Sequence, residues 1–473
     1  MLSRHIQTMR RAILGFAVFA VACCSFAGAS ATLLLEEPYG HMGWFTATGH
    51  AAVYLSNVCA ETPVVLRHCA PGETGVVLSR YDGVGGYDWV AIPLIPYLYA
   101  VERPEDVPLF ADAKMALSLR DRYRRNYLES VAPDGKEGVI PGGNWYELVG
   151  SSYDRTIYGF EIATTTEQDE ALIRKLNSSP NESHFHLASR NCADFAKDIL
   201  NFYYPKTLHR SVIADVGMTT PKQLAKMLTK FSARHPELES SRLIIAQVPG
   251  SMPRSSTPHG VVESFLKSEK YIVPSAVVSP IFAGCVAAVY VGTGAGHFEP
   301  ARDARVFVVG SEPQPPLGRE DRRAFQEQLK HFLAGAYPEG SSQKVDKTWE
   351  RLQSKAKTDF DAEGRPVLRL HVGDSEVQLG VSADNVLSGN APPELVRQLL
   401  EARLQAELRR KSPVEVSESE LARDWKLLQL AMLPPAAVQQ SLSQTSPLQS
   451  GGNDARLTAR SGRRSESLRG DRW

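Results

Sequence analysis

The residue best suited to chemistry in this chain is Cys192, at the start of a predicted helix. Apolar residues recur at helical spacing from Cys192 to residue 203, and Pro205 ends the pattern. Asn191 is a favourable N-cap, so Cys192 lies in the first turn, where unpaired amides and the helix dipole stabilise negative charge. This environment lowers the pKa of a thiol and predicts a nucleophilic thiolate. The alternative is a buried structural thiol, because free cysteine is among the most buried residue types.

The elements that must position this helix are short strands and two further helices. His50 follows Gly49 at the start of a β-prone run, and more strands are predicted at residues 64–69, 75–81, 88–92 and 157–162. Helices are predicted at residues 112–131 and 166–176. This order predicts an α+β fold in which an antiparallel sheet packs against helices. By itself, His50 is also compatible with an ordinary histidine at a strand end.

The order of these motifs resembles a known superfamily. A Gly–His pair that opens a strand, then a sheet, then Asn-Cys-x-x-Phe at a helix start is similar to the circularly permuted papain-like proteins. They include lecithin:retinol acyltransferase-like proteins, permuted NlpC-like hydrolases and PPPDE peptidases, in which the histidine strand precedes the cysteine. The resemblance covers about residues 38–210. It implies that Cys192 is the nucleophile and His50 its base.

Such a pair supports attack on an amide or ester carbonyl. Neutral imidazole takes the thiol proton, or the two groups form an ion pair, and the amide of Cys192 is the expected donor to the oxyanion. A third group should orient the imidazole. The resemblance favours His68 on the next strand, whereas a tight turn near residues 61–62 brings Glu73 closer, and we rank His68 slightly higher.

Composition and the N-terminus indicate an exported protein. The chain has 473 residues with 53 basic and 53 acidic side chains, so no overall field favours nucleic acid as a partner. Residues 1–31 combine arginines, an apolar run and a small-residue cleavage site, which predicts a secretory signal; an uncleaved anchor and lipoprotein processing at Cys23 are the alternatives. The expected location is the periplasm or cell envelope. In that oxidising compartment Cys59 and Cys69 can pair, which requires residues 60–68 to form a loop.

The chain beyond the predicted papain-like domain, residues 32–235, divides into three parts. Residues 236–310 contain a strand and an apolar run at 272–292, long enough to span a bilayer. We expect that run to contact a membrane, and burial in a soluble domain is the alternative. Residues 311–433 predict a small accessory α+β module without recognisable chemistry, with helices at 319–333, 345–355, 393–410 and 417–433 and a hairpin at 367–381 around Gly373. Residues 434–473 predict a disordered tail.

These observations predict an exported cysteine hydrolase or acyltransferase. Its expected catalytic residues are Cys192, His50 and His68, and its expected substrate is a cell-envelope peptide or a lipid or acyl compound. We expect no cofactor and no metal, because the sequence has no phosphate loop, dinucleotide fingerprint or metal-ligand cluster. The competing class is a non-catalytic envelope or membrane-anchored protein that keeps the fold for binding.

Overall fold

The computed structural model describes residues 29–40, 47–182, 184–293, 297–316, 318–336, 354–387 and 389–408, with Leu427 and Ala431. Three of the predicted features lie wholly or mostly outside these ranges. They are the leader, the helices expected at residues 345–355 and 417–433, and the tail from residue 434.

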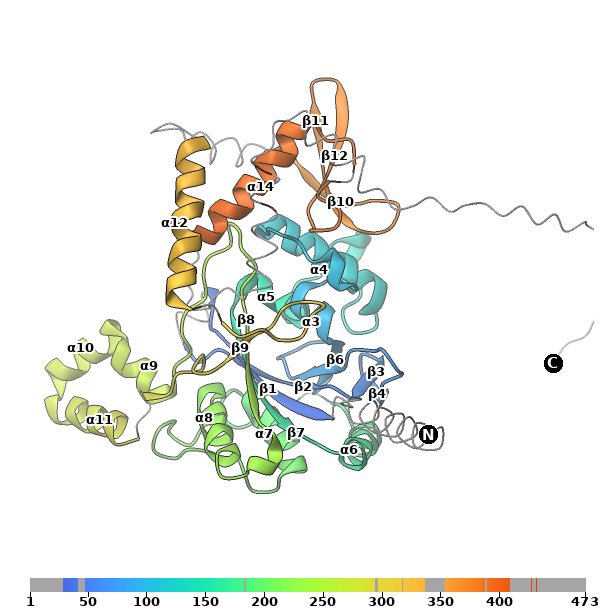
Figure 1. Ribbon diagram of the computed structural model, residues 1–473. Coiled ribbons are helices and arrows are strands. Elements are labelled where there is room, and N and C mark those ends of the chain that lie inside the picture. The colour runs from blue at the N-terminus through green and yellow to red at the C-terminus, as the bar shows by residue number, and fades with distance from the viewer. Residues whose placement is uncertain are drawn as a thin grey trace, which may run out of the picture.

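A mixed sheet forms the centre of the molecule (Figure 1), with the strand order β6-β5-β2-β1-β7-β8-β9. Its neighbours are antiparallel except β8 and β9, which are parallel. The strands are β1 (Ser30–Glu36), β2 (His50–Leu55), β5 (Val76–Ser79), β6 (Val90–Pro93), β7 (Ile157–Ala163), β8 (Ser241–Ile245) and β9 (Arg305–Val306). Helices pack on this sheet, so the predicted α+β class is confirmed.

The central strand β1 was not predicted. It pairs with β2 on one side and with β7 on the other, and all seven of its residues are buried. Ser30 and Ala31, the last residues of the predicted leader, begin this strand. An apolar run that continues from a leader has the same composition as a buried strand, so composition alone does not separate the two.

Alternate side chains of the central strands enter two different cores, because successive residues of a strand point to opposite faces. Leu33 and Leu35 of β1 pack on the face covered by α6 (Thr166–Ser178), α7 (Cys192–Tyr203) and α8 (Pro221–Ser232). Leu34 packs on the other face, which is covered by α3 (Leu94–Tyr99), α4 (Ala113–Tyr127) and α5 (Ser151–Asp154). Short 3-10 helices lie between these elements, at Pro104–Asp106, Lys136–Gly138, Asn144–Leu148 and Pro236–Leu238.

The C-terminal α+β module extends the second of these cores. It consists of α12 (Arg319–Ala336), a three-stranded antiparallel sheet and α14 (Pro393–Leu408). The strands are β10 (Lys357–Phe360), β11 (Pro366–Val372) and β12 (Ser375–Gly380), which confirms the predicted hairpin around Gly373. Leu368, Leu370 and Leu399 share one apolar cluster with residues of α3 and α4. The module therefore shares its core with the central sheet.

The apolar run at residues 272–292 forms two helices rather than one. The helices α9 (Val261–Lys267), α10 (Glu269–Val278) and α11 (Pro280–Thr293) project from the left side of the molecule in Figure 1. Pro280 separates α10 from α11, because proline lacks the amide that would continue a helix. Among the described residues, no helix combines the length and apolarity needed to cross a membrane.

A second hairpin carries the disulfide. Strands β3 (Val58–Thr62) and β4 (Val65–His68) form a separate two-stranded sheet, and Cys59 and Cys69 are bonded with their Cα atoms 4.9 Å apart. The expectation that residues 60–68 form a loop is therefore wrong, because most of them belong to the two strands of this hairpin. Strand β4 therefore pairs with β3 and not with β2.

Removing this crosslink is expected to lower stability without affecting the thiol at residue 192. The bridge closes a loop of 10 residues, and restricting that loop in the unfolded chain contributes about 2–3 kcal/mol. Urea denaturation of the Cys59→Ser, Cys69→Ser variant should show this decrease in the free energy of unfolding. An unchanged free energy of unfolding would show that the hairpin is already ordered in the unfolded chain.

Candidate active site

The start of α7 is fixed by a reciprocal cap, in which Asn191 is the N-cap that the sequence predicted and Asp194 is a partner that it did not. The Asn191 side chain accepts a hydrogen bond from the amide of Asp194 at 2.9 Å, and the Asp194 carboxylate accepts one from the amide of Asn191 at 3.4 Å. Thr219 and Lys197 donate to the same carboxylate at 2.6 and 3.0 Å. These hydrogen bonds hold the backbone of the first turn in one conformation, and that backbone carries the Cys192 side chain.

The thiol of Cys192 has a higher pKa than its place at a helix start suggests. Burial raises the pKa of the Cys192 thiol to about 11, although hydrogen bonds from the backbone amides of Ala51 and Ala193 act in the opposite direction. The predicted low pKa is therefore wrong, because loss of hydration disfavours the thiolate more than two amides stabilise it. The same contacts place the sulfur beside Ala51, the residue that follows His50.

His50 is held firmly at the first position of β2. Its Nε2 is hydrogen-bonded to the Ser79 hydroxyl at 2.7 Å, and its ring stacks on Tyr81 with centroids 4.4 Å apart and planes 9° apart. Burial, with a smaller effect of Arg155, lowers the pKa of His50 well below its usual value, so the imidazole is neutral at pH 7. In the tautomer whose Nε2–H donates to Ser79, Nδ1 carries the lone pair that a base needs.

The glycine of the Gly–His pair has a steric role. Gly49 has a φ of +73°, and a Cβ there would lie 2.0 Å from the carbonyl oxygen of Glu36 on β1. Only a residue without a side chain fits that approach of the two backbones. Gly49 thus allows β2 to begin at His50, in register with Glu36.

The thiol and the imidazole approach β2 from its two sides. Ala51 packs in the core of α7, whereas Tyr81, the stacking partner of His50, belongs to the core of α3 and α4. Cys192 and His50 both belong to the described part of the chain, and no hydrogen bond joins them there. Catalytic hydrogen bonds often form only when substrate is bound, so this geometry is compatible with a base that engages the thiol during reaction.

The predicted orienting residues lie elsewhere. His68 is exposed on β4, opposite Val58, and Glu73 accepts hydrogen bonds from Arg67 at 2.7 Å and from the amide of Ala70 at 2.6 Å. Neither is hydrogen-bonded to His50, because the strand beside β2 is β5 and not β4. The side chain hydrogen-bonded to His50 is instead the Ser79 hydroxyl on β5. A lone serine in an apolar strand gave no sequence signal for this contact.

A buried polar network extends from the stacked face of His50. The hydroxyls of Tyr81 and Tyr97 are 3.4 Å apart, and Tyr97 donates to the fully buried carboxylate of Glu36. Arg155 lies 3.2 Å from Glu36 and is itself buried. Burial raises the pKa of Glu36, and Arg155 and Tyr97 partly oppose that effect. The sequence analysis missed all four residues, since none belongs to a motif.

Charged residues also surround the α7 side of the site. Arg80, directly after β5, pairs with Asp88 at 2.6 Å, donates to the carbonyl of Asn191 at 3.4 Å and covers the ring of Phe195. The half-exposed Arg190 pairs with the same carboxylate at 3.2 Å. The guanidinium of Arg190 thus lies half-exposed next to the helix start, where it can hold a carbonyl or carboxylate of a bound molecule, whereas that of Arg80 is buried.

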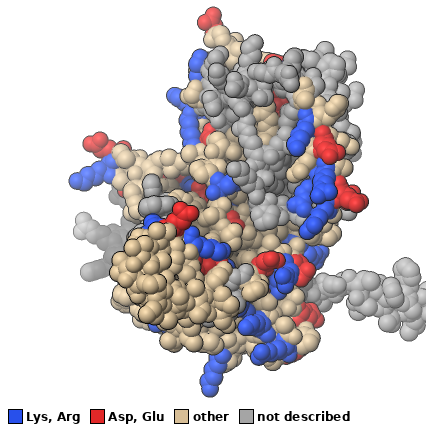
Figure 2. All heavy atoms as spheres, turned by 90° about the vertical axis from the view of Figure 1, so that its left-hand side faces the viewer, with Lys and Arg blue, Asp and Glu red and all other residues tan. Residues whose placement is uncertain are grey.

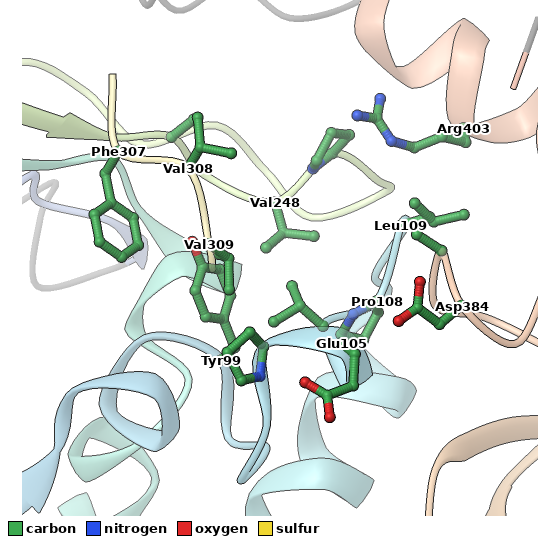
Figure 3. A pocket seen from close by; sticks show the side chains of 15 residues that line it. Tyr99, Glu105, Pro108, Leu109, Val248, Phe307, Val308, Val309, Asp384 and Arg403 are labelled. Carbon is green, nitrogen blue, oxygen red and sulfur yellow. The ribbon is translucent and has the colours of Figure 1, made fainter. Parts of the chain in front are cut away.

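A cavity of about 330 Å³ lies away from these residues (Figure 3). It opens between the loop after α3, the residues after β9 and the C-terminal module, and neither Cys192 nor His50 lines it. Its labelled charged side chains are Glu105, Asp384 and Arg403. The described residues contain one group with metal-ligand spacing, Cys59, Cys69 and Glu73, and the disulfide removes both sulfurs as ligands.

Alkylation of Cys192 should be slow at neutral pH. The thiolate is the reactive form, and a pKa of about 11 leaves about one thiol in a thousand or fewer ionised at pH 8. The iodoacetamide rate at Cys192, followed by peptide mass spectrometry, should rise until about pH 11. An inflection below the free-thiol value of about 8.5 would contradict this assignment and restore the helix-terminus prediction.

No family model matches the chain, no curated protein matches it, and no solved structure matches it.

Proposed function

We propose that this protein is an exported thiol hydrolase or acyltransferase with a permuted papain-like arrangement, in which Cys192 is the nucleophile and His50 its base. One observation carries the proposal. The sulfur lies in the first turn of α7 beside the amide of Ala51, and the preceding residue, His50, is a neutral histidine with Nε2 fixed by Ser79. The proposed nucleophile, a base in the required protonation state and an orienting hydroxyl thus all lie around the first two residues of β2.

The reaction follows from these groups. The thiol proton passes to Nδ1 of His50 as the sulfur–carbon bond forms on the carbonyl of an ester or amide. The resulting oxyanion accepts a hydrogen bond from the backbone amide of Cys192 at the helix start, because the amides of Ala193 and Asp194 are already used by the thiol and the cap. The imidazolium returns the proton to the leaving alcohol or amine, and water or another alcohol or amine then removes the acyl group from sulfur.

Both groups are neutral before reaction, and this has a kinetic consequence. The pKa of Cys192 is about 11 and that of His50 lies well below 6.5, so a resting ion pair is unfavourable. Proton transfer and attack must therefore occur together. The rate of Cys192 acylation should stay nearly constant from about pH 7 to about pH 9. It should not fall towards pH 7, because His50 is not protonated in that range.

Intact-mass measurement with p-nitrophenyl acetate tests the proposal. The full chain should gain one acetyl group on Cys192, which hydroxylamine removes because the bond is a thioester. The exposed Cys285 provides an internal control, since it lies outside the site and should not turn over. Acylation of Cys285 but not of Cys192 would contradict the proposal.

The raised pKa of Cys192 favours a second candidate, a binding protein of the envelope that keeps the fold without chemistry. A thiol that is hard to ionise behaves as a small apolar side chain. In that case p-nitrophenyl acetate leaves Cys192 unmodified, and the half-exposed Arg190 serves only to bind. The same experiment therefore separates the two candidates.

A further inference from the structure

The helices α10 and α11 present a large apolar surface that the described parts of the chain do not cover. Figure 2 looks at this side, and a broad, uncharged knob faces the viewer with charged side chains at its border. The most exposed side chains lie around the turn between the helices: Val277 (80%), Val278 (85%) and Ile281 (81%). Such a surface in water requires a partner.

The distribution of apolar residues favours lipid over a protein groove. The helix α11 contains no charged residue, and α10 contains none after Lys270. A helix that docks in a protein groove has one apolar stripe and one polar face. A helix that is apolar on all sides is instead typical of a buried or membrane-embedded segment. Because α10 and α11 are exposed, the membrane is the environment that fits them.

The lengths of the two helices limit how deep they reach. The 14 residues of α11 extend about 21 Å and the 10 residues of α10 about 15 Å, against about 30 Å of hydrocarbon in a bilayer. Neither helix spans that layer. A hairpin that folds back at Ser279 fits within one leaflet.

The stem of the hairpin has the chemistry of a membrane surface. Lys267 and Lys270 precede the apolar residues, and the Lys270 ammonium lies 4.7 Å from the ring centre of Tyr271. Phe265 of α9 stacks on Tyr271 and meets Phe282 edge-on, so the stem is held together by rings. Lysines attract anionic head groups, and tyrosines favour the boundary between head groups and hydrocarbon.

The stem is anchored to the rest of the protein by buried polar contacts. Glu263 of α9 is 1% exposed and pairs with Lys222 of α8 at 2.7 Å and with Lys267 at 2.9 Å. The amide of His259 donates to the carbonyl of Ala47 at 2.8 Å, three residues before His50. These contacts connect the hairpin to α8 and to the segment just before β2.

We propose that the α10–α11 hairpin inserts into one leaflet of a bilayer that contains anionic lipid. The tip residues around Ser279 enter the hydrocarbon, and Lys267, Lys270 and Tyr271 of the stem remain at the head groups. The hairpin thus holds the candidate active site beside a membrane surface without crossing it.

A fluorescent label on Cys285 tests this insertion locally. Cys285 is an exposed thiol on α11, and replacing Cys23→Ser, Cys24→Ser and Cys192→Ala leaves it as the only free thiol of the full chain. An NBD label there should shift to the blue and brighten several-fold with phosphatidylcholine–phosphatidylglycerol vesicles. Brominated lipid should quench it. The readout is independent of the thiol chemistry and of any leader contact with lipid.

Matched variants decide whether the hairpin tip is responsible. Val278→Asp with Ile281→Asp should reduce vesicle affinity, read from the label, at least tenfold. Val139→Asp with Val372→Asp introduces the same charges at exposed valines outside the hairpin (62% and 43%) and should leave the affinity unchanged. A label that stays in water, equal affinity of the two variants, or a blue shift that grows with protein concentration in the absence of lipid would overturn the proposal, the last in favour of protein self-association.

Discussion

Cys192→Ala should abolish acylation of the protein by p-nitrophenyl acetate at this site and all turnover that depends on it. The loss is expected to be at least a thousandfold, because no other described thiol lies at a helix start beside a histidine strand. The fold should survive, since a single sulfur is lost from a capped first turn. Circular dichroism and urea denaturation provide the check on folding.

His50→Ala should cost nearly as much as Cys192→Ala, and the double variant little more than either. Two groups that act as one catalytic unit show this strong non-additivity. Without the imidazole the thiol, with a pKa of about 11, has neither a proton acceptor nor a donor for the leaving group. Ser79→Ala should cost less, about tenfold, because water can replace the hydroxyl at Nε2. Full activity of a folded His50→Ala variant would show that another group is the base.

Arg155→Met should be the most destabilising substitution near the site. It leaves the Glu36 carboxylate buried without its cation, and breaking a buried ion pair costs about 3–5 kcal/mol. The same guanidinium also lies 3.2 Å from Glu147 and over the ring of Tyr39. Urea denaturation should show the decrease in the free energy of unfolding.

Two further variants identify the cause of that decrease. Adding Glu36→Gln to Arg155→Met removes the uncompensated charge and should recover part of the lost stability. Arg67→Met breaks an exposed pair with Glu73 and should change stability little, because solvent screens that pair. Equal losses in Arg155→Met and Arg67→Met would show that the buried network contributes no more than a surface pair.

The elements that the sequence predicted correctly, such as α7 and the start of β2, are marked by local patterns. The 3.6-residue spacing after Asn191 and the asparagine cap place α7 where the structure has it. The Gly–His pair marks the start of β2, because Gly49 permits a backbone approach that no other residue tolerates. These features depend only on residues that are close together in the sequence, so one sequence is enough to predict them.

The features that the sequence did not predict depend on long-range packing. Strand β1 continues from an apolar leader and could not be told apart from it by composition. His68 lies away from His50 because β4 pairs with β3. The pKa of Cys192 depends on how deeply its sulfur is buried against β2, which no local pattern reports. Ser79 becomes the partner of His50 only through the register of β2 and β5.

The separation of the Cys192 sulfur and His50 Nδ1, measured in a crystal structure with a substrate-like aldehyde bound to the thiol, tests the central claim most directly. The proposed mechanism predicts that Nδ1 lies within about 4 Å of the sulfur or of the new hydroxyl, with Nε2 still on Ser79. An imidazole that remains stacked on Tyr81 with Nδ1 more than about 6 Å from both atoms would contradict the assignment of His50 as the base.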